Sequence, residues 1–285
     1  MINTTSHSSI ELLCNRRFYP LFWVQFLGAF NDNLFKNAMV MLITFKLTNT
    51  SAETGLLITL AAGLFILPFF VFSTIAGQIA DRYSKNILIK KIKLTEVLIM
   101  LLGSMALLSQ SLILLFITLF LMGAQSAFFG PIKYSILPEI LDEQTLIKGN
   151  ALFSGSTFLA ILIGTIIGGM GILMDEGVFI MAGLVVVTAI LGFIFSLFVV
   201  EIKEGDSTLK IEWNWFKSTY QLIQESRTHK VAFFSVLAIS WFWFIGAVML
   251  SQIPALVKYE LHADDGVVIL FFALFSIGLA LGPAL

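Results

Sequence analysis

The sequence is poor in charge and in cysteine, and each shortage excludes a class of protein. Only 12% of its 285 residues are charged, about half the share found in an ordinary soluble domain. Cys14 is the single cysteine, so neither a disulfide framework nor a cysteine metal cluster can form within one chain. The formal net charge is −1 and the sequence has no basic cluster with interleaved aromatics, so we expect no nucleic-acid partner.

Recognisable catalytic motifs are missing as well. The sequence has no P-loop and no adenylate-forming loop rich in Gly, Ser and Thr. None of its histidines is followed by an aspartate five residues later, which excludes an H-x-x-x-x-D acyltransferase motif. The histidines lie far apart in predicted loops or tails and are interpreted as surface residues: His7, His229 and His262. We therefore expect these residues to form no enzyme and to bind no metal or cofactor.

What the sequence does have is long apolar runs. Hydrophobic residues make up 58% of the chain and the mean hydropathy is +0.94, which is typical of an integral membrane protein. A bilayer core takes about 20 helical residues, whereas a barrel strand takes about 10 residues of alternating polarity. The runs have the helical length, so we predict an all-α membrane protein with eight spans: residues 20–45, 55–80, 87–109, 111–132, 150–173, 178–200, 231–257 and 266–285.

The basic residues predict the orientation of these spans, because cytoplasmic loops carry an excess of lysine and arginine. With the N-terminus inside, only Lys46 and Lys258 fall outside, and Lys36 falls within the membrane. The other fourteen of the 17 basic residues then face the cytoplasm: Arg16, Arg17, Arg82, Lys85, Lys90, Lys91, Lys93, Lys133, Lys148, Lys203, Lys210, Lys217, Arg227 and Lys230.

The first span carries an acid and a base near its middle. A charge such as Asp32 or Lys36 costs roughly 2.5–3.5 kcal/mol in a bilayer core, so it normally faces a partner or a wet cavity. The i, i+4 spacing leaves a second interpretation open, in which the two groups neutralise each other on one helix face. Because Asn31, Asn33 and Asn37 extend the polar stripe beyond what self-pairing requires, we favour a functional site.

The inner loop between spans two and three carries a second informative stretch, GQIADRYSK at residues 77–85. Its glycine allows close helix contact, and its acid can hold a helix end or a base in one conformation and release it in another. The alternative is a plain positively charged anchor. The stretch resembles the signature loop of the major facilitator superfamily, G-x-x-x-D-R-x-G-R/K-R/K, although Ser84 and Asn86 depart from it. The resemblance implies a conformational latch centred on Asp81, and the matching positions are Gly77, Asp81, Arg82 and Lys85.

Spans four and five carry two further candidates. Lys133 is either an interface lysine or a cation that faces a cavity, and we expect Pro131 and Pro138 to break the helix around it. Asn150 is a candidate helix cap. Span five has the small-xxx-small spacing of close helix packing at Gly164 and Gly168.

Four stretches narrow the resemblance to the bacterial lysophospholipid transporter family. VQFLGAFNDN at residues 24–33 looks like the first span of that family. PIKYSIL at 131–137 and KGNAL at 148–152 look like segments that follow its fourth span. SWFWFIG at 240–246 is most similar to members fused to an acyl-ACP synthetase and a phospholipid acyltransferase. One departure is that span seven contains no basic residue, whereas we expect an arginine there in stand-alone members.

The resemblance implies that lysophospholipid, especially lysophosphatidylethanolamine, moves from the outer to the inner leaflet of the bacterial inner membrane for reacylation. Asp32 and Asn33 would meet the amine of the head group or a coupling cation. Lys36 or Lys133 would meet the phosphate as a point charge. The implied partners are the lysolipid, the bilayer and a fused or associated acyl-ACP synthetase and acyltransferase.

The longest loop divides the predicted spans. A six-span unit, a long cytoplasmic loop and further spans are the layout of a transporter built from two bundles. We therefore expect an N-terminal bundle at 1–200, a linker at 201–230 and the first two spans of an incomplete second bundle at 231–285. Residues 1–285 alone are then expected not to transport. The linker also predicts a helix lying on the inner leaflet through one face: Trp213, Phe216, Tyr220 and Ile223.

Two other functions stay open. A proton-driven exporter of amphiphilic drugs would share the signature loop, the glycine-rich fifth span and the intramembrane acid Asp32. Alternatively, the chain is the membrane part of an acyltransferase fusion and mainly tethers or feeds that enzyme.

Overall fold

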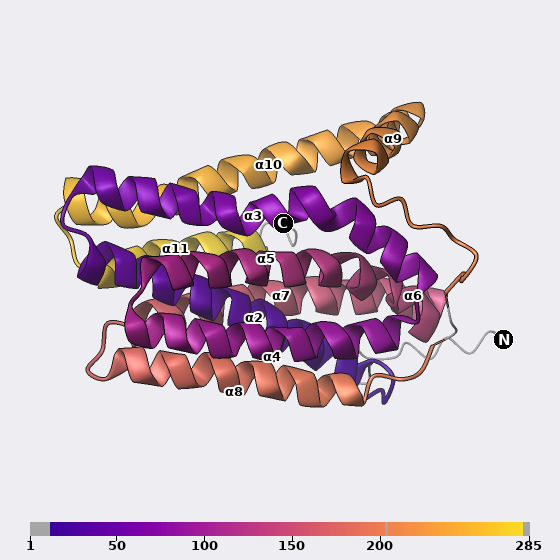
Figure 1. The fold of residues 1–285 in the computed structure, drawn as a ribbon, viewed down its shortest axis with the longest axis horizontal. Coiled ribbons are helices and arrows are strands. Elements are labelled where there is room, and N and C mark those ends of the chain that lie inside the picture. Colours follow the sequence, from indigo (N-terminus) through magenta and orange to yellow (C-terminus); the bar gives the residue numbers. More distant parts are fainter. Residues whose placement is uncertain (1–11, 203–204, 282–285) are drawn as a thin grey trace.

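The structure, a computed structural model, describes residues 12–202 and 205–281, and all of its regular elements are helices (Figure 1). The predicted tail at 1–11, Lys203 and the end of the last predicted span at 282–285 lie outside the described residues. The elements are α2 (Tyr19–Leu42), the π-helix η1 (Ile43–Leu47), α3 (Ser51–Arg82), α4 (Lys85–Ser109), α5 (Leu112–Ser135), α6 (Leu137–Ile140), α7 (Glu143–Gly171), α8 (Gly177–Leu197), α9 (Trp215–Thr228), α10 (Lys230–Ala255), the π-helix η2 (Leu256–Glu260) and α11 (Asp265–Leu281). The all-α membrane fold expected from the sequence is confirmed.

Six of these helices are long and apolar enough to cross a membrane, and they include α3, α4, α5 and α8. The other two are Thr145–Gly171 within α7 and Phe233–Glu260 across α10 and η2. The first predicted span, α2, is not among them although it has 24 residues. Its polar stripe lowers its hydropathy, and its position explains why that is tolerated. More than half of α2 is buried by neighbouring helices, so little of it has to face lipid.

The bundle is built by pairs of long helices that lie side by side. α2 packs mainly against α7 and α8, α3 against α5, and α4 against α8 and α5. α10 contacts α3 and α11 contacts α7. Figure 1 shows α4 and α8 along one edge of the bundle and α10 along the opposite edge, beyond α3. Residues far apart in the chain therefore meet between α2, α3, α5, α7 and the last two helices.

Glycine permits a close approach between α2 and α7. A Cβ at Gly164 would lie 2.6 Å from the carbonyl oxygen of Phe30, and one at Gly168 would overlap the carbonyl oxygen of Leu34. Gly77 is different, because a Cβ there would meet nothing within 4 Å. The expectation of a close helix contact at Gly77 is therefore wrong.

Two local predictions near the ends of α5 and α7 are also wrong. Pro131 lies inside α5, which continues to Ser135, so this proline does not break the helix before Lys133. The break expected near Pro138 is present, because α5 ends at Ser135 and Pro138 sits in the first turn of α6, where the missing N–H has no helical partner to lose. Asn150 lies within α7 and donates to the carbonyl oxygen of Leu146 over 3.1 Å. The helix is capped instead by Asp142, whose carboxylate accepts from the backbone N–H of Thr145 over 2.9 Å.

The linker helix α9 docks on α3 through polar side chains. Gln78 donates to the Ser218 hydroxyl over 3.1 Å and accepts from the backbone N–H of Glu212 over 2.7 Å. Lys217 donates to Glu212 over 2.5 Å, and this hydrogen bond holds the pKa of the Glu212 carboxyl below its usual value. Phe216, Tyr220 and Ile223 are exposed side chains of this helix, whereas Trp213 precedes its first residue and so does not belong to the predicted helical face.

Candidate functional site

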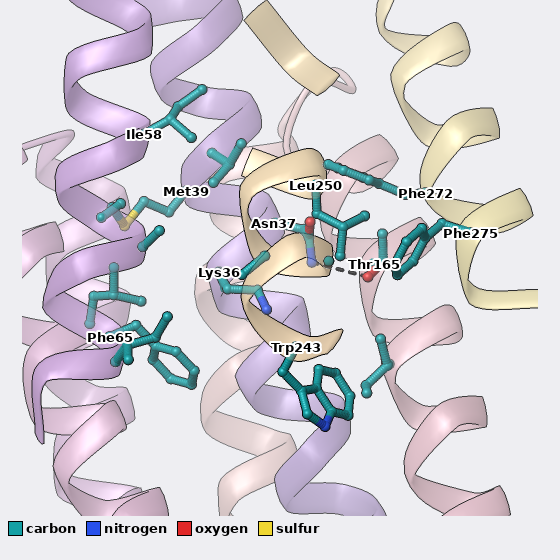
Figure 2. A pocket seen from close by; sticks show the side chains of 18 of the residues that line it. Lys36, Asn37, Met39, Ile58, Phe65, Thr165, Trp243, Leu250, Phe272 and Phe275 are labelled. Carbon is teal, nitrogen blue, oxygen red and sulfur yellow. Dashed lines mark hydrogen bonds between the residues drawn. The ribbon is translucent and has the colours of Figure 1, made fainter. Parts of the chain in front are cut away.

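A cavity of about 320 Å³ lies between the first helices of the chain and the last two (Figure 2). Side chains from α2, α3, α5, α7, α10 and α11 line it, and nearly all of them are apolar. The polar exceptions include Asn37 and Thr165, which face each other across the α2–α7 contact at 3.1 Å. Lys36 is the one charged residue in the lining. The cavity is therefore an apolar chamber with a single cation in its wall.

Lys36 is held by its own helix and by an aromatic ring. Its ammonium donates to the side-chain oxygen of Asn33 over 3.1 Å and lies 5.6 Å from the centre of the Phe65 ring. Asn33 is fixed in turn, because its amide donates to the carbonyl oxygen of Ala29 over 2.8 Å. Figure 2 shows Lys36 on the side of the cavity nearest Trp243 of α10. The amide of Asn33 thus orients the cation, and the Phe65 ring stabilises it.

Asp32 lies one helical turn before Lys36 and turns to a different partner. Its Oδ2 accepts from the Ser126 hydroxyl of α5 over 2.7 Å. Within the described chain, the ion pairs do not include one between Asp32 and Lys36. The self-pairing interpretation is therefore not the arrangement that the structure adopts. The acid and the base are bound to separate neighbours, and each remains half-buried.

The sequence interpretation missed a buried ion pair next to this site. Lys93 and Glu96 of α4 are 0% and 2% exposed, and their charged atoms lie 2.6 Å apart. The assignment of Lys93 to the cytoplasmic set is wrong, because its side chain is enclosed by the bundle and packs 5.3 Å from the centre of the Phe129 ring. The sequence did contain a signal for this pair, because Glu96 follows Lys93 by three residues inside the predicted third span.

The ion pair is connected to Asp32 by two residues of α5. Gln125 donates its amide to Oε2 of Glu96 over 3.1 Å, and its own oxygen lies 3.2 Å from the Ser126 hydroxyl. Ser126 in turn donates to Asp32. A continuous polar chain therefore runs from α4 through α5 to α2.

Lys133 lies on the same helix as Ser126, seven residues later, but outside the cavity lining. Lys133 is half-buried, and its ammonium sits 5.1 Å from the centre of the Tyr134 ring. Seven residues are about two helical turns, so Lys133 follows Ser126 along one face of α5. The structure brings Asp32, Asn33 and Lys36 together on α2, and of these four predicted site residues Lys36 alone belongs to the lining of the cavity.

The predicted latch residues gather at the far end of α3, away from the cavity. Lys85 pairs with Glu139 of α6, and the Arg82 guanidinium lies 5.5 Å from the centre of the Tyr83 ring. Asp81 has an exposed side chain, and its backbone carbonyl accepts from the N–H of Asp206 over 3.1 Å. The linker thus contacts α3 at the predicted latch through a backbone hydrogen bond.

At the far end of α2 from its N-terminus, η1 and the residue that follows it contact η2. The Lys258 ammonium donates to the backbone carbonyls of Thr44 and Thr48, the latter over 3.1 Å. The neighbouring Tyr259 hydroxyl lies 2.9 Å from that of Thr54. A π-helix pairs its backbone groups differently from an α-helix. Here a lysine from a distant part of the chain binds one carbonyl of η1 and the carbonyl of the residue after it.

Comparisons with known proteins agree with this architecture. The family model described as "Major Facilitator Superfamily" matches residues 21–285. Proteins named "Lysophospholipid transporter LplT" from Yersinia pestis (strain Pestoides F) and from Yersinia pseudotuberculosis serotype O:3 (strain YPIII) are each 27% identical over 286 residues. The match covers 97% of this chain and 63% of each relative, so the chain spans less than two thirds of their length.

Solved structures show the same fold at lower sequence similarity. Crystal structures of the peptide transporter POT in complex with sulfate, one of a mutant and one without that change, superpose with TM-scores of 0.55 and 0.53. Each is 15% identical to this chain. The superpositions cover 87% and 86% of this chain and 53% of each solved chain.

Proposed function

The chain belongs to the major facilitator superfamily, and from that membership we propose that it forms part of a transporter for lysophospholipids. The substrate would move from the outer to the inner leaflet of a bacterial inner membrane, with the N-terminus of the protein in the cytoplasm. The naming of the LplT relatives supports this substrate class. Residues 1–200 would form one bundle, 201–230 the linker and 231–285 the first part of a second bundle.

The observation that carries the proposal is the cavity with one cation in an apolar wall. A lysophospholipid has one acyl chain and a head that bears a phosphate, so it needs one positive group and a long apolar flank. The volume of about 320 Å³ lies at the lower end of ordinary small-ligand pockets. It would take the head group and the adjoining part of the chain.

Lys36 is the residue proposed to meet the phosphate. It is the charged residue of the lining, and a lysine ammonium binds phosphate as a compact point charge. The Asn33 amide holds it from one side, so Asn33 would act on the head group through Lys36. Lys133, two turns from Ser126 on α5, would meet the phosphate along the path between the cavity and the cytoplasm.

Asp32 is the residue proposed to meet the amine of the head group or a coupling cation. Ser126 occupies its Oδ2, and in the described part of the chain no donor is bonded to Oδ1. Asp32 and Lys36 are one helical turn apart on the same face of α2. A zwitterionic head could therefore bridge them, with its phosphate toward the cavity.

Two sets of residues would govern the change of conformation. Gly77, Asp81, Arg82 and Lys85 form the proposed latch at the cytoplasmic end, where Lys85 already pairs with Glu139. Lys258 would close the opposite end through its contacts with Thr44 of η1 and with Thr48. An acyl-ACP synthetase and acyltransferase, fused or associated, would consume the delivered lysolipid.

The test is uptake of labelled lysophosphatidylethanolamine by spheroplasts that lack their own lysolipid transporter and carry the full-length parent chain. Uptake is expected with the intact chain and should fall at least tenfold in Lys36→Met and in Asp32→Asn at equal membrane expression. Lys91→Met is the matched control, because Lys91 is an exposed lysine of α4. If the intact chain shows no uptake, the lysolipid assignment fails. If uptake persists in Lys36→Met, the cation in the cavity does not bind the substrate.

A further inference from the structure

The polar chain that ends at Asp32 begins on a helix that does not line the cavity. Lys93 and Glu96 of α4 are enclosed by protein, and neither is among the cavity-lining residues. The neighbouring helices make room for them: a Cβ at Gly28 of α2 would lie 2.6 Å from the Lys93 ammonium, and one at Gly192 of α8 would lie 3.6 Å away. Glycines of α2 and α8 therefore leave the space that the buried ammonium of α4 occupies.

A buried ion pair is an expensive way to hold helices together. Taking two charges out of water costs more than their attraction returns unless hydrogen bonds satisfy the remaining atoms. Here one atom is not satisfied, because Oε1 of Glu96 is buried without a hydrogen-bond partner. Apolar side chains of similar volume would pack these helices at least as well. The pair is therefore better explained by what it does to its neighbours.

Its first effect is to fix the amide of Gln125. Oε2 of Glu96 accepts from both Lys93 and Gln125, and a carboxylate oxygen can only accept. The NH₂ of the Gln125 amide must then point to α4, and its oxygen must point the other way. That oxygen lies 3.2 Å from the Ser126 hydroxyl.

The second effect is on Ser126, which carries a single hydroxyl hydrogen. Its oxygen lies 2.7 Å from Oδ2 of Asp32 and 3.2 Å from the oxygen of Gln125. A three-centre hydrogen bond with the shorter arm to the carboxylate satisfies both acceptors. The hydroxyl is thus held in the rotamer that binds Asp32, and the carboxylate is held in one orientation on the face of α2 that it shares with Lys36.

We propose that Gln125 and Ser126 are positioning residues, anchored by Lys93 and Glu96, that aim the Asp32 carboxylate at the amine of the head group. The chain would thereby set the preference for lysolipids that carry an amine over those that do not. This inference rests on the proposed function and names the residues that select its substrate. Loss of the hydrogen bonds made by Gln125 or Ser126 should change the selectivity between head groups more than the total rate of transport.

The experiment compares uptake of lysophosphatidylethanolamine with uptake of lysophosphatidylglycerol, which has a phosphate but no amine, using the full-length parent chain. Ser126→Ala should lower the ratio of the two uptake rates about tenfold, since hydrogen bonds to charged groups are the strong ones. Ser126→Thr keeps the hydroxyl and should keep the ratio. Thr118→Val is the matched control on α5, because its buried hydroxyl has no partner to lose.

A double-mutant cycle separates positioning from general packing. If Ser126 acts through Asp32, Ser126→Ala should not lower the ratio further in an Asp32→Asn background. An unchanged ratio in Ser126→Ala, or an equal loss in Ser126→Thr, would overturn the inference while uptake by the intact chain leaves the proposed function standing. Absence of uptake of both lipids by the intact chain would overturn the proposed function and the inference together.

A second variant covers the case in which Ser126→Ala does not reach the membrane. Gln125→Met removes the amide and keeps its length, so Ser126 loses the acceptor that fixes its rotamer. The expected loss of selectivity is smaller, about threefold, because the Ser126–Asp32 bond itself remains. A ratio equal to that of the intact chain would count against the inference in the same way.

Discussion

Replacing Lys93 with methionine removes the ammonium from the buried pair on α4 and keeps a side chain of similar reach. Glu96 would then be a charged carboxylate with one oxygen bonded only to Gln125 and the other without a partner. Removing one member of a buried pair typically destabilises a protein by about 3–5 kcal/mol, because an uncompensated charge is left behind. We expect Lys93→Met to fall in this range.

The double variant Lys93→Met/Glu96→Gln tests whether the unpaired carboxylate of Glu96 causes this loss of stability. It removes both charges, and the new amide at position 96 can still accept from Gln125. Exchange of a buried ion pair for neutral residues is often neutral, so the double variant should lie within about 1 kcal/mol of the parent chain. Adding Glu96→Gln should therefore restore at least about 2 kcal/mol to the Lys93→Met variant, which is the lower end of its expected loss less the remaining loss of about 1 kcal/mol.

The assay is chemical unfolding of the purified full-length parent chain in detergent, followed by far-UV circular dichroism. Lys91→Met serves as the control, because it removes an exposed lysine two residues away on the same helix. If Lys93→Met costs no more than Lys91→Met, the pair is not buried as described. If the double variant is as unstable as Lys93→Met alone, the unpaired carboxylate is not the cause of the loss.

The remaining predictions concern the two places where distant helices meet. Gly168→Val should destabilise the fold by about 1–3 kcal/mol or more through overpacking, because the new side chain would overlap the carbonyl oxygen of Leu34. Gly183→Val is the control and should be tolerated, because its side chain would point into open space. The yield of folded protein in detergent measures both effects. Lys258→Met should speed the labelling of Met39→Cys by a membrane-impermeant maleimide about tenfold. The carbonyls of Thr44 and Thr48 would lose a donor worth about 1.5–3 kcal/mol, and the weaker contact between η1 and η2 would admit the reagent to the cavity that Met39 lines. Labelling at the parent rate would show that Lys258 does not keep the cavity closed.

Much of the fold could be predicted from the sequence because the length of an apolar run depends on neighbouring residues alone. The third predicted span, 87–109, corresponds to α4 at Lys85–Ser109, and the sixth, 178–200, to α8 at Gly177–Leu197. Helix ends that depend on a single residue were less predictable. Pro131 and Asn150 favour breaks or caps in isolation, yet both lie inside helices that continue beyond them.

Lys93 shows why the buried polar chain could not be predicted. The positive-inside rule assigns a lysine by its position in the chain, and Lys93 lies three residues after Lys90 and two after Lys91 at the cytoplasmic end of the predicted third span. What decides its environment is Glu96 one turn later, together with a glycine on α2 and another on α8 that leave space for its ammonium. Those glycines are 65 and 99 residues away in the chain, and no local pattern relates them to α4.

The same limit applies to Asp32, and it also explains why the site lies on α2. Spacing alone allowed Asp32 to pair with Lys36, but its carboxylate bonds to Ser126 of α5 because of the register in which those helices pack. A helix that faces lipid cannot carry such groups without a large cost. α2 is covered by α7 and α8 and reached by α4 and α5, so its polar atoms can be satisfied by other helices. The low hydropathy that makes α2 look like a poor membrane span and the concentration of the candidate site on it therefore have one cause, its central position in the bundle.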